Sequence, residues 1–386
     1  MAATKKLAVV TSTRADYGLL RGVLAKLFCL PDVTTLLVAT GTHLSSAYGN
    51  TVQEIENDGF PIAARIPILQ ADTAATMACT FTAFSAWLRE TKPHAILLLG
   101  DRFEIFSVAS AAAVEKVPIL HISGGDVTEG AEDDFYRHCI TKMASVHFPS
   151  NADSAARLLR MGEQPDTVHN VGGLGDENIR SLTLMSKAEL EKRIGFALQA
   201  PYALVTFHPQ TAGNADAAAQ FNTLLAALDK IPLRYIFTKA NADAGGAAIN
   251  ALIDAYCQKN AASCIAFTSM GVLRYLAAMR SAAVVIGNSS SGVVETPTFG
   301  VPTVNIGTRQ AGRIVCDNVL CCPVEEQEIE NAVRTALTPT FIQRAKATQS
   351  PYNGGNTSGK IVQLVHDYLY SARRGAPKLF YDAQEG

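Results

Sequence analysis

The sequence predicts an α/β protein with two doubly wound domains, each a parallel sheet with helices on both faces. The chain has 386 residues, and a single domain usually has roughly 100–200. Short apolar runs alternate with helical patterns in both halves, and this alternation favours parallel sheets. Most of the runs are continuously apolar, as is typical of strands that are buried on both faces.

The first half contains a series of short apolar runs that we interpret as strands. They are Leu7–Thr11, Thr35–Ala39, Ala95–Leu99, Ile119–Ile122, Val146–Pro149 and Val168–Val171. After the first run, apolar residues recur from Leu20 at i, i+3, i+4, i+7 and i+8, which is one face of a helix. The sequence therefore predicts a strand, a helix and a second strand in its first forty residues or so.

The second half repeats the pattern. Its predicted strands are Ala203–Phe207, Tyr235–Thr238, Cys264–Phe267, Val284–Ile286, Thr303–Ile306 and Val319–Cys322. The glycine-rich polar segment 172–182 is the predicted hinge between the halves, and we expect a late helix over Ile361–Tyr370.

Composition and charge narrow the class of protein. Only 18% of the residues are charged and the net charge is −2, which gives no support for a nucleic-acid or membrane partner. The basic start is followed by too short an apolar run for a signal peptide. The eight cysteines show no CxxC pair. We therefore expect reduced thiols in a cytoplasmic protein.

Polar residues that directly follow the strands are the candidates for a functional site, because ligands bind at the carboxyl ends of strands in open α/β sheets. In the first half these are Arg14, Asp16, His43, Asp101 and the acidic segment 126–134. In the second half they are His208, the segment 287–295, Arg309 and Arg313.

The stretch "IGNSSSGVVE" (286–295) presents serine hydroxyls and backbone N–H groups at an expected helix start, which is an anion site. His208, Arg309 and Arg313 would add positive charge or hydrogen bonds that suit a diphosphate. Glu295 could accept hydrogen bonds from ribose hydroxyls. The alternatives are a serine-rich helix cap without a ligand and a helix anion at Glu295.

The carboxylates of the first half are the candidates for chemistry. Crowded carboxylates repel one another, so that one is protonated beside one that is ionised, as proton transfer requires. Asp101 directly follows a strand. For Glu129 and Glu132 we favour a solvated loop instead. No GxGxxG, GxxxxGK[ST] or HExxH motif is present, so we expect no NAD, FAD, P-loop nucleotide or metal, and no cofactor.

Several segments together resemble one family. They are "TSTRADYGLL", "LLLGDRFEIFSVA", "HISGGDVTEGAEDDFYRHCITKMASVHF", "FHPQT", "IGNSSSGVVE" and "VNIGTRQAGR". Over nearly the whole chain, and in the same order, they are similar to the hydrolysing UDP-N-acetylglucosamine 2-epimerases.

The resemblance implies the GT-B architecture, in which two Rossmann-like domains face a cleft and a C-terminal helix crosses back. The implied N-terminal domain is residues 1–172 plus 363–386, and the UDP-binding domain is residues 173–362. Members of the family are dimers or tetramers, so we expect a homo-oligomer.

The implied reaction eliminates UDP from UDP-N-acetylglucosamine to give a 2-acetamidoglucal. Water then adds at C1 and a proton at C2 on the opposite face, which releases N-acetylmannosamine for nonulosonic acid synthesis. By motif position, the implied catalytic carboxylates are Asp101, Asp133 and Asp134. Animal-type relatives carry Glu at Ser123, whereas this chain places its acid at Asp126, like the bacterial branch. The split between acid and base stays open.

The resemblance also assigns the binding residues. The positions that bind UDP are Arg14, His208, Ser289, Ser290, Glu295 and Arg309. Tyr275 either packs on the uracil or is a core aromatic residue, and His43 faces the sugar. His121 and Arg137 lie close enough in sequence to tune the acids. Asp16 is expected to cap its helix and to orient Arg14.

Four alternatives share parts of this pattern. A hydrolysing epimerase of UDP-N,N′-diacetylbacillosamine has the same motifs, and a non-hydrolysing epimerase lacks the water addition. A GT-B glycosyltransferase requires an acceptor. A binding protein without catalysis would have lost the carboxylates, which are present here.

Overall fold

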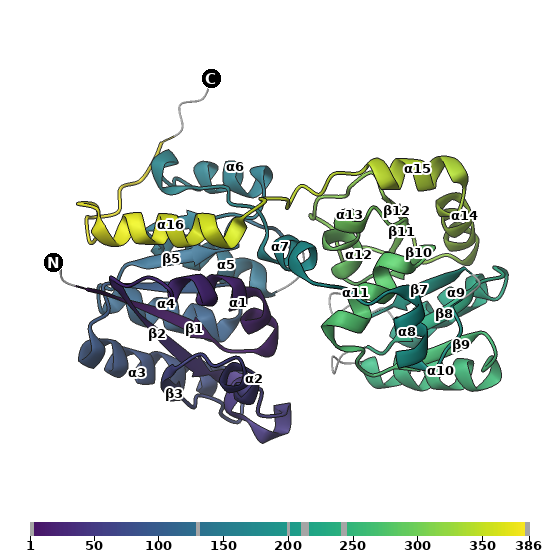
Figure 1. Cartoon of the computed structure of the whole chain (residues 1–386), viewed down its shortest axis with the longest axis horizontal. Helices are drawn as coiled ribbons and strands as arrows, with labels where there is room; N and C mark the ends of the chain where they lie inside the picture. The colour runs from purple at the N-terminus through teal and green to yellow at the C-terminus, as the bar shows by residue number, and fades with distance from the viewer. Residues whose placement is uncertain (1–3, 129–131, 199–200, 210–215, 241–244, 383–386) are drawn as a thin grey trace. The chain divides into compact units, whose positions relative to one another are not determined.

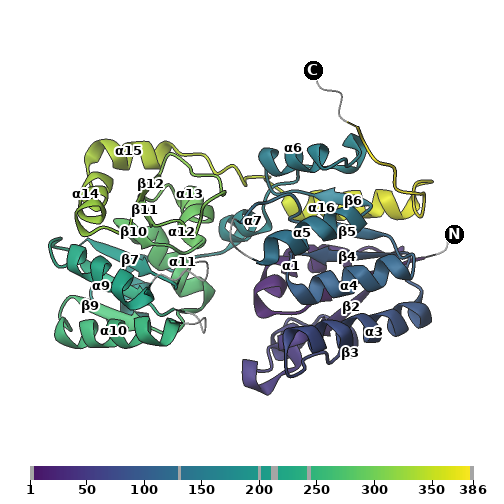
Figure 2. The ribbon, with the colours of Figure 1, turned by 180° about the vertical axis from the view of Figure 1, so that it is seen from behind.

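The computed structural model describes residues 4–128, 132–198, 201–209, 216–240 and 245–382. The chain divides into two compact units. Unit 1 comprises Met1–Asp126, Glu132–Asn178 and Pro351–Gly386, and unit 2 comprises Val127–Ala131 and Ile179–Ser350. Figure 1 and its rear view, Figure 2, label the helices and strands of both units.

Unit 1 is built on a parallel sheet with the strand order β3-β2-β1-β4-β5-β6. The strands are β1 (Lys5–Thr11), β2 (Val33–Thr40), β3 (Ile62–Ile66), β4 (Ala95–Leu99), β5 (Ile119–Ile122) and β6 (Val146–Phe148). This is the doubly wound order of dinucleotide-binding folds. Five of the strands lie where the sequence predicts them, and β3 is the one that the pattern did not predict.

Helices cover both faces of this sheet. They are α1 (Arg14–Leu27), α2 (Val52–Asn57), α3 (Thr73–Thr91), α4 (Phe103–Val114), α5 (Glu132–Met143), α6 (Ala152–Arg160) and α16 (Thr357–Tyr370), with α7 (Leu174–Ser181) at the boundary between the units. Leu20 and Leu24 of α1 share one apolar core with Ile361 and Leu369 of α16. The other face packs against α3, α4 and α5, which Figure 2 shows in front.

Unit 2 repeats the plan with the strand order β12-β11-β10-β7-β8-β9. Its strands are β7 (Tyr202–Thr206), β8 (Arg234–Thr238), β9 (Cys264–Phe267), β10 (Val284–Gly287), β11 (Thr303–Ile306) and β12 (Val319–Cys322). Its helices are α8 (Lys187–Ile194), α9 (Ala217–Leu228), α10 (Gly246–Lys259), α11 (Gly271–Ser281), α12 (Ser291–Val294), α13 (Thr296–Phe299), α14 (Glu326–Ala336) and α15 (Pro339–Ala347). All six predicted strands of this half are confirmed.

The strand predictions for the first half contain two errors, one predicted strand that does not form and one strand that was not predicted. Val168–Val171 makes only an isolated bridge, from Val168 to His147, and follows the short 3₁₀ helix η3 (Pro165–Thr167). Conversely, β3 forms over Ile62–Ile66 at the edge of the sheet. Its residues alternate between partly buried and exposed, so that it lacks the continuous apolar run by which the central strands are recognised.

The glycine-rich segment 172–182, the predicted hinge, is helical from Leu174, and the boundary between the two units falls within it, after Asn178. Gly172 has φ +88°, and a Cβ there would lie 2.3 Å from the Cα of Gly354. The Gly173 N–H donates to the carbonyl of Tyr352 at 2.7 Å. The returning chain therefore joins unit 1 from Pro351, whereas the sequence places the boundaries at 172/173 and 362/363.

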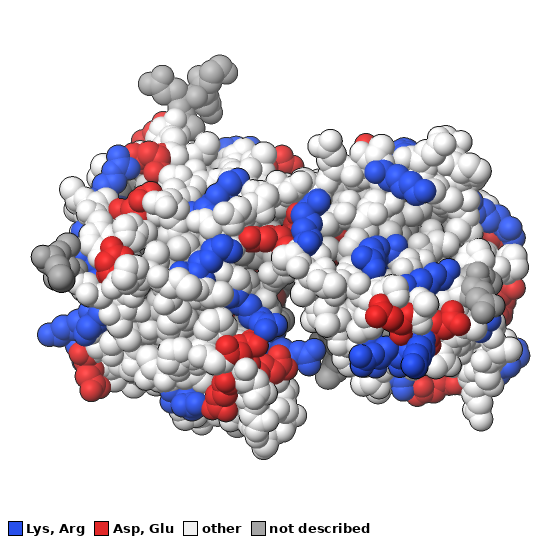
Figure 3. Space-filling view, in the orientation of Figure 1, with Lys and Arg blue, Asp and Glu red and all other residues white. Residues whose placement is uncertain are grey.

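Charged side chains are interspersed on the face drawn in Figure 3, where blue and red atoms alternate without a large patch of one sign. Among the described helices, none is both long enough and apolar enough to cross a membrane.

We predict that Gly172→Ala lowers the stability of unit 1 by about 2–4 kcal/mol, because an alanine there is strained at positive φ and also overlaps Gly354. Gly49→Ala is the matched control, since Gly49 has φ +85° but no atom within 4 Å of a Cβ. It is expected to cost about 1 kcal/mol. Denaturant unfolding of the full chain measures both, and equal losses would contradict the close packing at Gly172.

Candidate active site

The predicted site residues follow the carboxyl ends of adjacent strands in both sheets. In unit 1, β1 lies beside β4, and in unit 2, β7 lies beside β10. Each pair is the point where the strand order reverses, so the connections leave in opposite directions and the strand ends stay uncovered. The topology thus places two separate groups of polar residues at the two switch points.

The turn after β1 is organised by Asp16, which is buried at the start of α1. Its carboxylate accepts hydrogen bonds from the Ser12 N–H and hydroxyl at 2.9 Å each, and from the Thr13 N–H at 3.1 Å. The Thr11 hydroxyl donates to the same group. Burial opposes ionisation, but the imidazole of His43, whose Nε2 lies 3.9 Å from the carboxylate, and the hydrogen bonds from Thr11 and the backbone outweigh it and lower the pKa of Asp16. The predicted capping role is confirmed, as a capping box with Thr13.

His43 lies beneath this turn and is fully buried. The Thr11 hydroxyl gives its one hydrogen to Asp16, so its oxygen accepts from Nε2–H of His43 at 3.0 Å. The other ring nitrogen, Nδ1, lies 2.8 Å from the Thr51 hydroxyl. These contacts describe a residue that supports the β1–α1 turn, and its contact with a sugar stays a prediction.

Arg14 begins α1 and has a half-exposed side chain. Its Nε lies 3.7 Å from Glu54, in an ion pair in which both side chains are about half exposed. Such a pair contributes little to stability and is easily exchanged for another anion. No contact between Arg14 and Asp16 is found among the described residues, so Asp16 holds the backbone of the turn rather than the arginine.

Arg137 on α5 joins the carboxylates of unit 1. Its buried guanidinium donates to Asp101 at 2.7 Å, to Asp134 at 2.9 Å and to the backbone carbonyl of Asp126 at 2.8 Å. Asp101 comes directly after Gly100 at the end of β4, and Asp134 comes from the first turn of α5. The predicted grouping of Asp101 with the "EDD" acids is thus present, with an arginine at its centre.

Asp133 differs from its neighbours because it is not paired with the guanidinium. Burial and the nearby charge of Asp101 raise the pKa of Asp133, while Arg102 and Arg137 oppose the rise. Arg102 is held by the buried Glu104 at 2.8 Å. A carboxyl group with a raised pKa therefore lies beside two carboxylates that are paired with a cation.

Asp126 does not point its carboxylate into this cluster. One of its oxygens accepts from the Ser154 hydroxyl and lies 3.4 Å from both Ser150 and Asn151, at the start of α6. Only its backbone carbonyl meets Arg137. A catalytic role for this carboxylate stays a prediction. Glu129 lies outside the described residues.

His121 is fully buried in β5, and its Nε2 donates to the carbonyl of Gly100 at 2.8 Å. Burial lowers the pKa of His121 to about 3. The imidazole is therefore neutral at physiological pH. It fixes the turn that presents Asp101 and adds no charge to the acids.

Asn288 organises the strand ends of unit 2. Its fully buried side chain accepts from the N–H of His208 at 2.7 Å and donates to the His208 carbonyl at 2.8 Å. Its own carbonyl accepts from Gln310 at 2.9 Å and from Arg309 at 3.2 Å. The ends of β7, β10 and β11 are thereby tied together.

Donors without a protein acceptor gather at the same turn. The backbone N–H groups of Ser289, Ser290 and Ser291 have no acceptor within the described residues. Further along the chain, after β11, the buried Nε of Arg313 also has no partner within the described residues. Because α12 is only a four-residue turn, the helix dipole that the sequence suggested is small. An anion would be held by these individual N–H groups.

Gly287 makes this turn possible, because a Cβ at its position would lie 1.9 Å from the carbonyl oxygen of Thr206. Glu295 lies between α12 and α13, partly buried, and accepts from the Ser291 hydroxyl at 2.7 Å. Burial raises the pKa of Glu295 and also raises that of the neighbouring Tyr275 to about 12. Tyr275 packs at the edge of an apolar cluster, and its contact with uracil stays a prediction.

Comparison with known proteins identifies the family. Residues 27–366 match the UDP-N-acetylglucosamine 2-epimerase family, which is most of the chain. The chain belongs to this family. It is 39% identical over 322 residues to the GDP/UDP-N,N′-diacetylbacillosamine 2-epimerase (hydrolyzing) of Campylobacter jejuni, covering 82% of this chain and 84% of that protein. It is 36% identical over 391 residues to polysialic acid biosynthesis protein P7 of Escherichia coli, covering 99% and 98%.

Solved structures of the family share the fold. The crystal structure of UDP-GlcNAc 2-epimerase from Neisseria meningitidis bound to UDP-GlcNAc has a TM-score of 0.80 at 18% identity, covering 94% of this chain and all of that one. The predicted fold class, two Rossmann-like domains of the GT-B type, is confirmed.

Sequence reasoning missed several residues that organise the site of this 2-epimerase family member. Asn288 and Arg102 lie within the segments that carry the family resemblance, but the sequence pattern predicts no role for either. Both stand directly after or within one residue of a strand-end candidate, which is the signal that was available. Within the described ranges, no group of three or more His, Cys, Asp or Glu side chains is arranged to hold a metal ion.

We predict that Asp16→Asn lowers stability at neutral pH by about 1–3 kcal/mol, because the hydrogen bonds to the ionised carboxylate are weakened. A lowered pKa stabilises the fold above the ordinary aspartate value of 3.8. That contribution is lost as the pH falls through the folded value. The difference from wild type should therefore shrink in acid. Thermal unfolding between neutral and acidic pH measures it.

Asp72→Asn is the control, since Asp72 is an exposed cap of α3, and asparagine caps a helix equally well. A deficit of Asp16→Asn that stays constant down to the most acidic pH would contradict the pKa assignment.

Proposed function

We propose that this chain is a hydrolysing UDP-sugar 2-epimerase that converts UDP-N-acetylglucosamine and water into UDP and N-acetylmannosamine. The observation that carries the proposal is the Arg137 cluster, in which Asp101 and Asp134 are paired with one cation and the pKa of the adjacent Asp133 is raised by burial and by Asp101. Membership of the 2-epimerase family supports the same reaction.

The turn after β10 in unit 2 is proposed to hold the UDP portion. A diphosphate would supply acceptors for the free N–H groups of Ser289–Ser291 and for the buried Nε of Arg313. His208 and Arg309 are positioned through Asn288 beside the same turn. A role in UDP binding for Arg14, whose side chain is about half exposed, is part of the same proposal.

The chemistry requires both an acid and a base. The C2 proton of the sugar is not acidic, so it leaves only as the bond from C1 to the UDP oxygen breaks. A carboxylate accepts that proton, and UDP departs with the bonding electrons to leave a glucal. Water then gives its hydroxyl to C1 and its remaining proton to the solvent, and a carboxyl group gives a proton to C2 from the opposite face. Exchange with solvent afterwards restores the starting protonation of both carboxyl groups. We assign the base to Asp101 and the proton donor to Asp133.

A second candidate substrate is UDP-N,N′-diacetylbacillosamine. The Campylobacter jejuni relative at 39% identity and a Legionella pneumophila relative at 32% identity carry that sugar in their names. The reaction at C1 and C2 is the same for both. In either case the released amino sugar would supply nonulosonic acid synthesis. The enzyme itself is proposed to be a cytoplasmic homo-oligomer of two or four subunits.

We expect the protein in D₂O to release free UDP and a manno-configured amino sugar with deuterium at C2, because the C2 proton is exchanged for one from solvent. NMR identifies the products of parallel reactions with the two UDP-sugars. The substrate with the higher kcat/KM is the preferred one. Hydrogen retained at C2, or an epimerised sugar still linked to UDP, would refute hydrolytic epimerisation.

Asp101→Asn should lower kcat by at least about 100-fold, the usual contribution of a general acid or base. UDP affinity measured by calorimetry should change little, because unit 1 carboxylates are not proposed to hold the nucleotide. Asp72→Asn, an exposed aspartate of the same unit, serves as the control. Normal turnover with lost UDP binding would contradict the division of roles between the units.

A further inference from the structure

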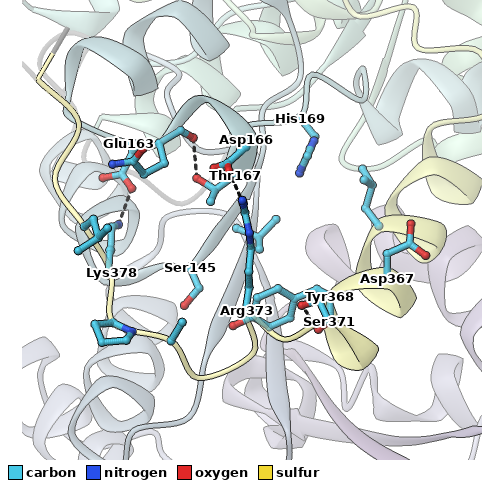
Figure 4. Close-up of a pocket in the computed structure, with 16 residues that line it drawn as sticks. Ser145, Glu163, Asp166, Thr167, His169, Asp367, Tyr368, Ser371, Arg373 and Lys378 are labelled. Atoms are coloured by element: carbon cyan, nitrogen blue, oxygen red, sulfur yellow. Dashed lines mark hydrogen bonds and ion pairs between the residues drawn. The ribbon is translucent and has the colours of Figure 1, made fainter.

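Unit 1 contains a cavity of about 450 Å³ at the amino end of β6 (Figure 4). The cavity is lined by Val146, the first residue of this strand, and by Ser145, which directly precedes it. The carboxylates of the candidate active site follow the opposite, carboxyl ends of the same parallel sheet. The cavity is thus a separate feature, and its volume is in the range of small-molecule sites.

Much of the lining is apolar and comes from three segments of the chain. Val146 comes from β6, Leu364 and the ring of Tyr368 come from α16, and Pro377 and Leu379 come from the segment that follows α16. Such a surface is suited to the apolar face of a ligand, because transferring that face from water is favourable.

Three polar side chains of the lining have no hydrogen-bond partner in the part of the chain that the structure describes. The hydroxyls of Ser145 and Tyr368 and the imidazole of His169 make no side-chain hydrogen bond within the described residues. Burial lowers the pKa of His169, so its ring is neutral and can both donate and accept. Three neutral hydrogen-bonding groups from different segments therefore border one cavity, as Figure 4 shows.

The charged groups of the lining are mostly neutralised in pairs. Lys378 lies 2.5 Å from the buried Glu163, whose carboxylate also contacts Lys142, outside the lining, at 2.7 Å. Arg373 is paired with Asp166 (Figure 4). Asp367 is the remaining charge, and its side chain is 59% exposed. An anion would find no unpaired cation in this lining, so the cavity is better suited to a neutral molecule.

We propose that this cavity is a second ligand site of unit 1, which binds a small neutral molecule of the class of N-acylated amino sugars. Hydroxyl and amide groups of such a sugar match the unpaired Ser145, His169 and Tyr368. Its C–H face and acyl methyl match Leu364 and Leu379. The fit of such a sugar to the cavity does not depend on the proposed function. Binding of N-acetylmannosamine as the enzyme's own product rests on the proposed function.

The test uses the full chain with labelled leucine methyl groups and saturating UDP, which occupies the proposed nucleotide site. N-acetylmannosamine and N-acetylglucosamine are titrated separately, and the anion glucuronate is the charge control. We expect saturable shifts of the Leu364 and Leu379 methyl signals with Kd on the order of 1 mM for the neutral sugars. Glucuronate should produce none of these shifts.

Two variants locate the binding. Leu364→Trp fills the cavity and should abolish sugar binding while UDP-sugar turnover without added free sugar persists. Tyr368→Phe removes one hydroxyl and should weaken binding about 2- to 10-fold, as for one neutral hydrogen bond. Leu69→Trp, at a leucine that is 36% exposed elsewhere in unit 1, is the matched control and should bind as wild type.

The proposal is overturned if the Leu364 and Leu379 signals do not move, if glucuronate binds as well as the neutral sugars, or if Leu364→Trp binds normally. If Leu364→Trp fails to fold, an unchanged affinity in both Tyr368→Phe and Ser145→Ala overturns it. Because the methyl signals report on the cavity itself, this outcome is distinct from a failure of the proposed reaction, which is measured by turnover of the UDP-sugar.

Discussion

Parallel pairing between the first and fourth strands of each sheet is the constraint on which both groups of functional residues depend. Leu7 of β1 pairs with Ala95 of β4, and Val205 of β7 pairs with Ile286 of β10. From each pair the chain departs to opposite sides, so no connection covers the strand ends. The carboxylates that follow the strand ends in unit 1 and the N–H donors that follow them in unit 2 therefore owe their positions to the same strand order.

The two units satisfy their polar groups in different ways. Unit 1 uses charge, since the buried guanidinium of Arg137 makes the proximity of Asp101 and Asp134 tolerable. Unit 2 uses a neutral amide, since Asn288 satisfies the backbone of His208 while leaving nearby N–H groups free. A site that must bind phosphates benefits from unpaired donors, whereas a site that transfers protons benefits from carboxyl groups with different affinities for the proton.

The sequence predicted eleven of the twelve strands and the strand ends that carry polar residues, because buried parallel strands are continuous apolar runs. It could not predict β3, whose edge position leaves only a weak alternation. The sequence pattern also could not predict where the Asp126 carboxylate points. Its hydrogen-bond partners Ser150, Asn151 and Ser154 lie more than twenty residues further along the chain. Arg137 was expected near the acids, but its three contacts at once depend on tertiary packing.

The returning helix α16 has a consequence for the order in which the protein is made. Ile361, Val365 and Leu369 are part of the apolar core beneath β1 and α1, although a whole unit of sequence, Ile179–Ser350, is translated between them. Because domains fold as units during synthesis, unit 2 can complete its core first. Unit 1 begins earlier on the ribosome, but its core lacks Ile361, Val365 and Leu369 until α16 has been translated, so the apolar residues that they cover are exposed to water for longer.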